Sequence, residues 1–170
     1  VLESVKLPSI TALPDETFNK CSALKQVTLP ETMESIGQKA FAESGITSIT
    51  LSDNVKKINA SAFYASKQLE KVVCGKNLET IGGNAFEGCS GLTNITLPDG
   101  LKTIGSKTFY GCDKLTELAI PNSVTTLGNN VFENCEHLTK ITLGNGLTAI
   151  PNYAFNKCYD LEEIVVPYKV

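Results

Sequence analysis

Residues 92–114 read LTNITLPDGLKTIGSKTFYGCDK, and most of the remaining sequence repeats this 23-residue unit. The phenylalanines mark the repeat, because every one of them falls at the same place in the unit: Phe18, Phe41, Phe63, Phe86, Phe109, Phe132 and Phe155. Their spacings are 23, 22, 23, 23, 23 and 23 residues. Self-similarity at a period of roughly 20–50 residues is typical of a solenoid, in which each unit covers the apolar face of its neighbour. The sequence therefore predicts a solenoid with one buried row of phenylalanines.

The first half of each unit has the pattern of a short strand. The units open with an apolar residue at Leu2, Leu24, Ile46, Leu69, Leu92, Leu115, Leu138 and Leu161, and the last of them is only a strand. Apolar residues follow at the third and fifth positions after it, with a polar residue between them, as in Ile95-Thr96-Leu97. Such alternation predicts a half-buried strand. In five units a proline such as Pro98 comes next, and it ends the strand because it has no backbone donor.

The second half of the unit makes two further passes over the core. Two apolar residues three apart, as in residues 124–128, predict an extended or turn-like segment, and the glycine that follows is expected to permit a sharp corner. The stretch around each phenylalanine, such as residues 84–89, is expected to form one or two helical turns that depend on packing.

Two units lack one residue, in residues 7–13 and in residues 41–46, and both gaps fall in connections, where deletions are tolerated.

The pattern L-x-x-[IV]-x-L-P-x-x-[VLM]-x-x-I-G-x-x-A-F-x-x-C covers the whole chain and resembles the BspA-type leucine-rich repeat. The resemblance implies an α/β repeat fold: a right-handed solenoid with a concave parallel β-sheet, about seven units of 22–23 residues and a final strand. It also implies a single leucine-rich-repeat domain over residues 1–170 and a cell-surface or secreted location. A regular asparagine ladder, common in better-known leucine-rich repeats, is missing, because the nearest positions hold Thr32, Asn54, Asn77, Gly100, Ser123 and Gly146.

Composition limits the partners that this chain can have. It has 170 residues, 42% of them hydrophobic and 19% charged, which is enough to form a sizeable core. The net charge of −3 is dispersed, so nucleic acid and anionic membrane surfaces are disfavoured, and no apolar run is long enough to insert into a membrane. We expect a monomer. The chain starts and stops inside repeats, so we interpret it as a piece of a longer protein.

The cysteines are the first candidates for chemistry, because five of the six lie three residues after a phenylalanine: Cys21, Cys89, Cys112, Cys135 and Cys158. This placement predicts a column along the solenoid, whereas a metal site needs ligands that converge on a point. Disulfides within the column are an alternative, but parallel Cβ vectors fit their geometry poorly. We therefore interpret the column, and Cys89, Cys112, Cys135 and Cys158 in particular, as reduced, buried thiols.

No residue pattern indicates catalysis or a cofactor. His137 is the single histidine, and no cysteine or serine is fixed beside it, so we expect an exposed turn residue. The acidic residues occur at turns and lack the spacing of calcium loops. The resemblance carries no catalytic residues over, and we expect the protein not to be an enzyme.

The exposed strand positions remain as the candidate binding surface. We expect ligand contacts on the concave face, at Gln26, Thr28, Ser48, Thr50, Lys71, Asn94, Thr96, Glu117, Lys140 and Thr142. These rows hold none of the aromatic or arginine residues that dominate many interfaces, so Tyr64 and Tyr110 on the helical side form a rival patch.

The resemblance favours a cell-surface adhesion or recognition module that binds a protein or other extracellular macromolecule. The alternative is a structural spacer that presents another domain.

Overall fold

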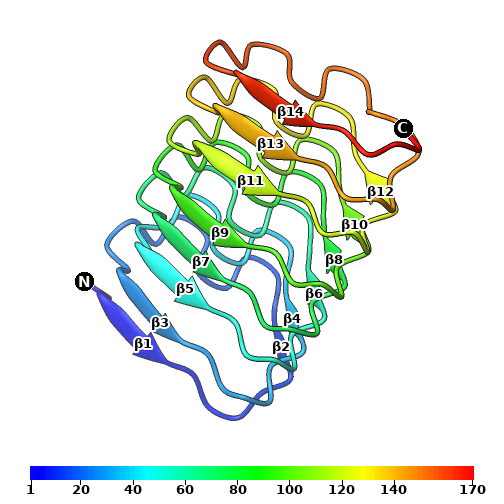
Figure 1. Ribbon diagram of the computed structural model, residues 1–170. Helices are drawn as coiled ribbons and strands as arrows, with labels where there is room; N and C mark the ends of the chain where they lie inside the picture. The colour runs from blue at the N-terminus through cyan, green and yellow to red at the C-terminus, as the bar shows by residue number, and fades with distance from the viewer.

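Each sequence unit forms one coil of a parallel β-solenoid in the computed structural model, which describes residues 1–170. There are about seven coils of ~23 residues. The coils stack in chain order, so the two termini lie at opposite ends of the stack (Figure 1). Strands of adjacent coils pair in parallel with equivalent residues opposite one another, as in Val72 and Ile95. This register places every repeat position in a column along the molecule.

The predicted strands are all present and form one row along the molecule (Figure 1). Each has three residues, and in six of the eight the middle one is buried or half-buried between two exposed neighbours. Their bounds are β1 Ser4–Lys6, β3 Gln26–Thr28, β5 Ser48–Thr50, β7 Lys71–Val73, β9 Asn94–Thr96, β11 Glu117–Ala119, β13 Lys140–Thr142 and β14 Glu163–Val165.

The second extended pass forms a separate sheet of six two-residue strands in the order β12-β10-β8-β6-β4-β2. The prediction of a further extended segment after the first strand is therefore confirmed. The bounds are β2 Ala12–Leu13, β4 Ser35–Ile36, β6 Lys57–Ile58, β8 Thr80–Ile81, β10 Thr103–Ile104 and β12 Thr126–Leu127.

The expected helical turns are absent, so the α/β description is wrong. The stretch around each phenylalanine is a run of turns, which we call the turn arm. Two residues of every turn arm have a left-handed backbone, at the second position before and the second after the phenylalanine, for example Lys107 (φ 56°) and Gly111 (φ 67°). A left-handed residue cannot continue a right-handed helix.

Alternating hydrogen bonds satisfy the backbone of the turn arm. The amide of Phe63 donates to Ala85 in the next coil at 2.8 Å, whereas the amide of its neighbour Tyr64 donates back to Ser61 at 3.0 Å. The first kind of bond joins coils and the second closes a turn. Together they leave few unpaired backbone donors on this side, although it has no regular secondary structure.

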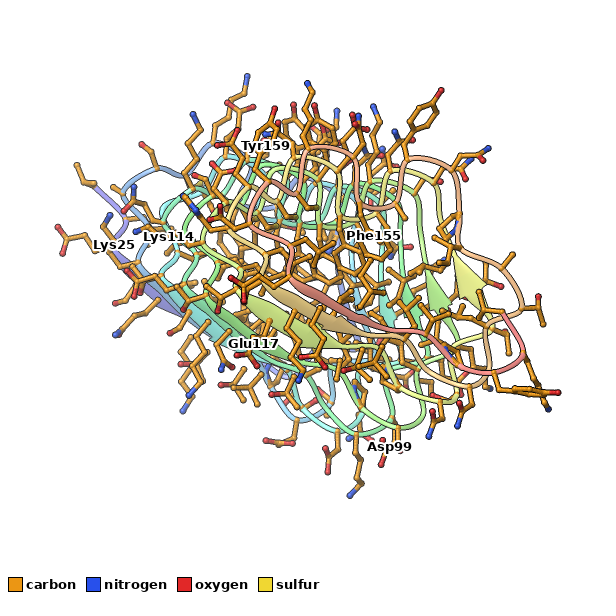
Figure 2. The ribbon with its side chains drawn as sticks, turned by 45° about the horizontal axis from the view of Figure 1, so that its top comes forward. Lys25, Asp99, Lys114, Glu117, Phe155 and Tyr159 are labelled. Atoms are coloured by element: carbon orange, nitrogen blue, oxygen red, sulfur yellow. The ribbon has the colours of Figure 1, made fainter.

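The phenylalanines stack in one row through the core, as predicted. Adjacent ring centroids are 5.1–5.8 Å apart, and adjacent ring planes lie within 19° of parallel. This spacing falls in the usual range for offset-stacked aromatic pairs. Five of the rings are fully buried and Phe18 is nearly so, but Phe155 is only half-buried because it belongs to the last turn arm. Figure 2 shows Phe155 in the interior of the coil.

The corner glycines are needed for a reason other than the one expected. None of Gly37, Gly82, Gly105 and Gly128 has a positive φ. Instead the coils approach closely there: a Cβ on Gly105 would lie 2.3 Å from the Gly83 nitrogen. At these four corners a side chain is excluded by contact between coils, and not by the direction of the turn; the third coil has Asn59 at this position, and its side chain donates to the Ile36 carbonyl.

Candidate functional site

The ten candidate residues lie on the outer side of the strand row, which we call the strand face. Eight of them are exposed, and Lys140 and Thr142 are half-buried. Glu117 lies on this outer side, whereas Tyr159 lies on the opposite side of the coil (Figure 2). The alternation of strand residues places these side chains outward because their apolar neighbours fill the core. Their outward position is as predicted, and their role in binding stays a prediction.

The sheet under the strand face is broken twice. Its strands pair as β1-β3, β5-β7-β9 and β11-β13-β14. At four of the five junctions within these groups, the residue after a strand donates to the next coil, as Leu51 does to Val73 at 2.9 Å; Cys74, after β7, is the exception. The equivalent bonds from Leu29 to Thr50 and from Leu97 to Ala119 are missing. The strand face therefore opens between β3 and β5, and between β9 and β11.

A shallow hollow lies over each break, one of about 370 Å³ and the other of about 270 Å³. Apolar side chains of the broken strands form part of each lining, with Ile49 in the first hollow and Leu118 in the second. Four candidate residues line each hollow: Gln26, Thr28, Ser48 and Thr50 in the first, and Thr96, Glu117, Lys140 and Thr142 in the second. The two other candidates, Lys71 and Asn94, lie on the unbroken strands between the hollows.

Charges on the strand face are partly free. Lys140 forms an ion pair with Glu163 of the next coil at 2.9 Å, and this hydrogen-bonded carboxylate raises the pKa of Lys140 above its usual value. Neither Lys71 nor Glu117 forms an ion pair. Both therefore remain available to a ligand.

The thiol column is structural. Cys89, Cys112 and Cys135 are buried as predicted, whereas Cys158, also expected to be buried, is half-buried because it lies in the last turn arm. No cysteine is bonded to another. The Cys89 thiol donates to the Phe63 carbonyl at 3.0 Å, and burial raises its pKa to about 12. A protonated, buried thiol is a poor nucleophile and a poor metal ligand.

His137 is exposed, as predicted, and it pairs with Asp160 of the next coil at 2.8 Å. The hydrogen bond to the Asp160 carboxylate raises the pKa of His137 above 6.5. In the preceding coil, burial raises the pKa of Asp113, and one oxygen of this carboxylate is buried without a hydrogen-bond partner. No group of three or more potential ligands is arranged to hold a metal ion. No helix of the structure is long and apolar enough to cross a membrane.

The two tyrosines do not form one patch. Tyr64 is 38% exposed, and Tyr110 is half-buried with the Lys107 ammonium 5.5 Å from its ring centroid. They lie two coils apart, and Glu87 occupies the equivalent position between them.

Sequence reasoning missed another hollow, of about 600 Å³, which Tyr64 shares with Lys25, Glu43 and Lys67. The only signal for it was the residue missing between Phe41 and Ile46, which was interpreted as a tolerated deletion.

Comparison with solved structures gives bacterial leucine-rich repeat proteins. A leucine-rich repeat protein of T. pallidum is 31% identical with a TM-score of 0.87, over 94% of this chain and 78% of that one. One from Bacteroides ovatus is 27% identical with a TM-score of 0.71, over 99% of this chain and 50% of that one. The pneumococcal vaccine antigen PcpA shares the fold, with 22% identity and a TM-score of 0.66 over 96% of this chain and 56% of that one.

No curated protein matches this chain in sequence. The family model of the BspA type leucine rich repeat region matches residues 1–92 and 57–170, with six copies of the repeat. Together these matches span the whole chain, so the protein belongs to the BspA-type leucine-rich repeat family.

Proposed function

We propose that the strand face binds an extended macromolecule, a protein or another extracellular polymer, at the bacterial cell surface. The observation that carries this proposal is the pair of hollows, which are lined by eight of the ten candidate residues. The hollows are three coil intervals apart along the molecule, which corresponds to about 14 Å at the usual strand spacing. A ligand that contacts both must therefore extend along several coils.

The chemistry of the face fits many modest contacts. Thr, Ser, Asn and Gln supply hydrogen-bonding groups, and the unpaired charges of Lys71 and Glu117 have opposite signs. Exposed ion pairs contribute about 0–1 kcal/mol each, so affinity comes from their sum over several coils and weakens as salt rises.

Two relatives support the location. One solved structure with this fold is a leucine-rich cell surface protein from Faecalibacterium prausnitzii, and another is a pneumococcal vaccine antigen. A surface location would give the strand face access to host or neighbouring-cell macromolecules.

The test captures a ligand from solubilised extracellular matrix with the immobilised protein and then compares two variants. The first combines Lys71→Glu, Glu117→Lys and Lys140→Glu on the strand face. The second makes the same three kinds of change at exposed positions beside the two-residue strands: Lys56→Glu, Glu79→Lys and Lys102→Glu. We expect the first variant to lose at least about tenfold in affinity, or roughly 1.4 kcal/mol, and the second to keep wild-type affinity.

Equal binding by the first variant and the wild type would rule out the strand face. Failure of the wild type to capture any ligand would favour the alternative, a structural spacer that presents another domain.

A further inference from the structure

The second coil is one residue short in the connection that leads from the turn arm to β5. Six residue steps separate Phe63 from Leu69, and the same number is found in the other units, but only five separate Phe41 from Ile46. The repeat pattern therefore breaks at one edge of the solenoid. Lys25, the second residue of the second coil, lies on this edge (Figure 2).

The shorter connection leaves the second coil with one residue fewer at this edge. Gly45 packs tightly against the first coil, where a Cβ on it would lie 1.9 Å from the Ser22 carbonyl oxygen; the equivalent Gly91, in a coil with a full-length connection, makes a similar approach of 2.4 Å. The Gly45 amide donates to the Cys21 carbonyl at 3.1 Å, which holds the shorter connection against the first coil. The equivalent connections of the first and third coils, residues 18–24 and 63–69, keep the full length.

At this edge lies a recess of about 600 Å³ lined mainly by polar residues, which we call the edge notch. Ser22 comes from the first coil, Lys25 and Glu43 from the second, and Tyr64, Lys67 and Gln68 from the third. Its volume lies within the range of roughly 300–1,000 Å³ that is usual for small-ligand sites. Of the four hollows in the molecule, this one has the largest volume.

The charges of the edge notch have no partners within the protein. The four ion pairs of the molecule involve neither Lys25, Lys67 nor Glu43. The two ammonium groups outnumber the single carboxylate, so the notch favours a ligand with one negative charge. Ser22, Gln68 and Glu43 add hydroxyl, amide and carboxylate groups, which together donate to and accept from a polyhydroxylated ring.

Tyr64 adds an apolar wall with a polar tip. It is 38% exposed and extends from the third coil. Aromatic side chains of this kind combine a flat apolar face with a hydroxyl, which suits a ligand that has both an apolar and a polar side. The C–H face of a pyranose ring is such an apolar side, and its rim of hydroxyls is the polar one.

We propose that the edge notch binds an acidic saccharide, a pyranose ring that carries one carboxylate. The carboxylate lies between Lys25 and Lys67, the ring lies against Tyr64, and Glu43, Gln68 and Ser22 hydrogen-bond the hydroxyls. This site is separate from the strand face and does not depend on macromolecular binding there. A carboxylated pyranose occurs as a terminal sialic acid on glycoproteins or as a uronic acid within a polysaccharide.

Titration followed by amide chemical shifts tests the proposal with four probes: N-acetylneuraminic acid, D-glucuronic acid, D-glucose and sodium acetate. We expect at least one of the two acidic sugars to shift the amides of residues 43–45 and 64–68. Glucose should bind at least about tenfold more weakly because it has no carboxylate. The acidic sugar with the lower dissociation constant identifies the source of the ligand.

Variants connect the binding to the notch. The double variant Lys25→Gln and Lys67→Gln should weaken binding at least about tenfold, and Tyr64→Ala should weaken it as well. Tyr110→Ala is the matched control, because Tyr110 has the equivalent position on a coil with a full-length connection. A serine inserted between Ser44 and Gly45 restores the usual spacing, fills the notch and should abolish binding while the fold is retained.

Three results would each overturn the proposal. The first is that neither acidic sugar shifts these amides at about 50 mM, a concentration that saturates a site with a dissociation constant near 1 mM. The second is that acetate produces the same shifts at the same concentrations as the sugars, which would mean that only an anion is bound. The third is that the insertion variant folds and binds as the wild type does.

Discussion

Three residues after each phenylalanine, the chain places either a cysteine or a serine, and most of these side chains donate to a carbonyl of the preceding coil. The Cys89 thiol donates to Phe63, and the Ser66 hydroxyl donates to Phe41 at 2.6 Å. The later cysteines repeat this bond at 3.0–3.3 Å. A small buried donor is therefore what the position requires, and the thiol is one of two ways to supply it.

Replacement of Cys89 tests this requirement. Cys89→Ser keeps a donor in reach of the Phe63 carbonyl, so we expect a loss of less than about 1 kcal/mol in the free energy of unfolding. Cys89→Ala removes the donor and leaves a small void, so a loss of about 1–2 kcal/mol is expected. Urea unfolding of both variants gives the comparison. A serine variant less stable than the alanine variant would show that sulfur packing matters more than the hydrogen bond.

The pair of His137 and Asp160 gives a second test at a single side chain. Because the Asp160 carboxylate stabilises the imidazolium, the pKa of His137 is raised in the folded state. Its contribution to stability is therefore complete below pH 6.5, its usual pKa, and is lost as the pH rises through the raised value. We expect an NMR titration to give a pKa above 6.5 for wild-type His137 and a lower one for Asp160→Asn. An unchanged pKa in the variant would contradict the pairing.

Within each coil, the strands follow from sequence pattern, whereas the turn arm does not. The alternation in Ile95-Thr96-Leu97 has a period of two, and this period identifies a strand whatever its neighbours do. A small residue followed by phenylalanine, as in Ala85-Phe86, fits a helical turn and a chain of β-turns equally well. The left-handed positions would separate the two, but only five of the fourteen hold glycine or asparagine: Asn84, Gly88, Gly111, Asn130 and Asn134. The amides of seven of the other nine donate to the next coil, and these bonds are not visible in one unit; Tyr153 and Lys157, in the last turn arm, have no following coil.

Glycine has two roles in a unit: it permits a left-handed backbone, and it permits the close approach of two coils. Gly88 and Gly105, in adjacent coils, allow these roles to be tested separately. A Cβ on Gly88 would meet Ala65 at 3.6 Å, an ordinary contact, so Gly88→Ala should cost only the left-handed backbone, about 1 kcal/mol. A Cβ on Gly105 would lie 2.3 Å from the Gly83 nitrogen, so Gly105→Ala must push two coils apart and should cost about 2–3 kcal/mol or more. Thermal and urea unfolding measure both. Equal losses in the free energy of unfolding would mean that the close approach of the coils is not the reason for glycine at the corner.

The reverse change should stabilise the protein. Ala65 occupies the left-handed position that Gly88 and Gly111 occupy in the next two coils, with φ 53°. Ala65→Gly relieves this conformation but makes the unfolded chain more flexible, so we expect a net gain of up to about 1 kcal/mol in the free energy of unfolding. A clear loss would contradict the left-handed assignment. Because Ala65 also lines the edge notch, saccharide binding by this variant should be measured separately.

Over the whole molecule, the sequence repeat predicts which strand residues face outward, but it does not predict where the sheet beneath them is broken. Sequence pattern makes every interface between coils equivalent, so it identified Thr96 and Glu117 as exposed without showing that the sheet breaks between their strands. The edge notch escaped prediction for a related reason. A missing residue is visible in the sequence, but the hollow beside it depends on how Gly45 and its neighbours pack against the first and third coils. The candidate sites therefore lie where the structure departs from the regular repeat: at the two breaks in the sheet and at the short connection before Ile46.

Because each coil contacts only its neighbours, position along the stack should decide how much a core truncation costs. Phe86 is fully buried between two rings, at 5.1 Å from Phe63 and 5.7 Å from Phe109, whereas the half-buried Phe155 has one ring neighbour, Phe132 at 5.8 Å. We expect Phe86→Ala to cost about 3–5 kcal/mol and Phe155→Ala about half of that. In a solenoid the interior change also interrupts the coupling between the two halves. Urea unfolding should therefore stay a single transition for Phe155→Ala and become broader or biphasic for Phe86→Ala. Equal losses at the two positions, or a loss below about 1 kcal/mol at Phe86, would contradict the prediction that the cost of a truncation depends on its position in the phenylalanine row.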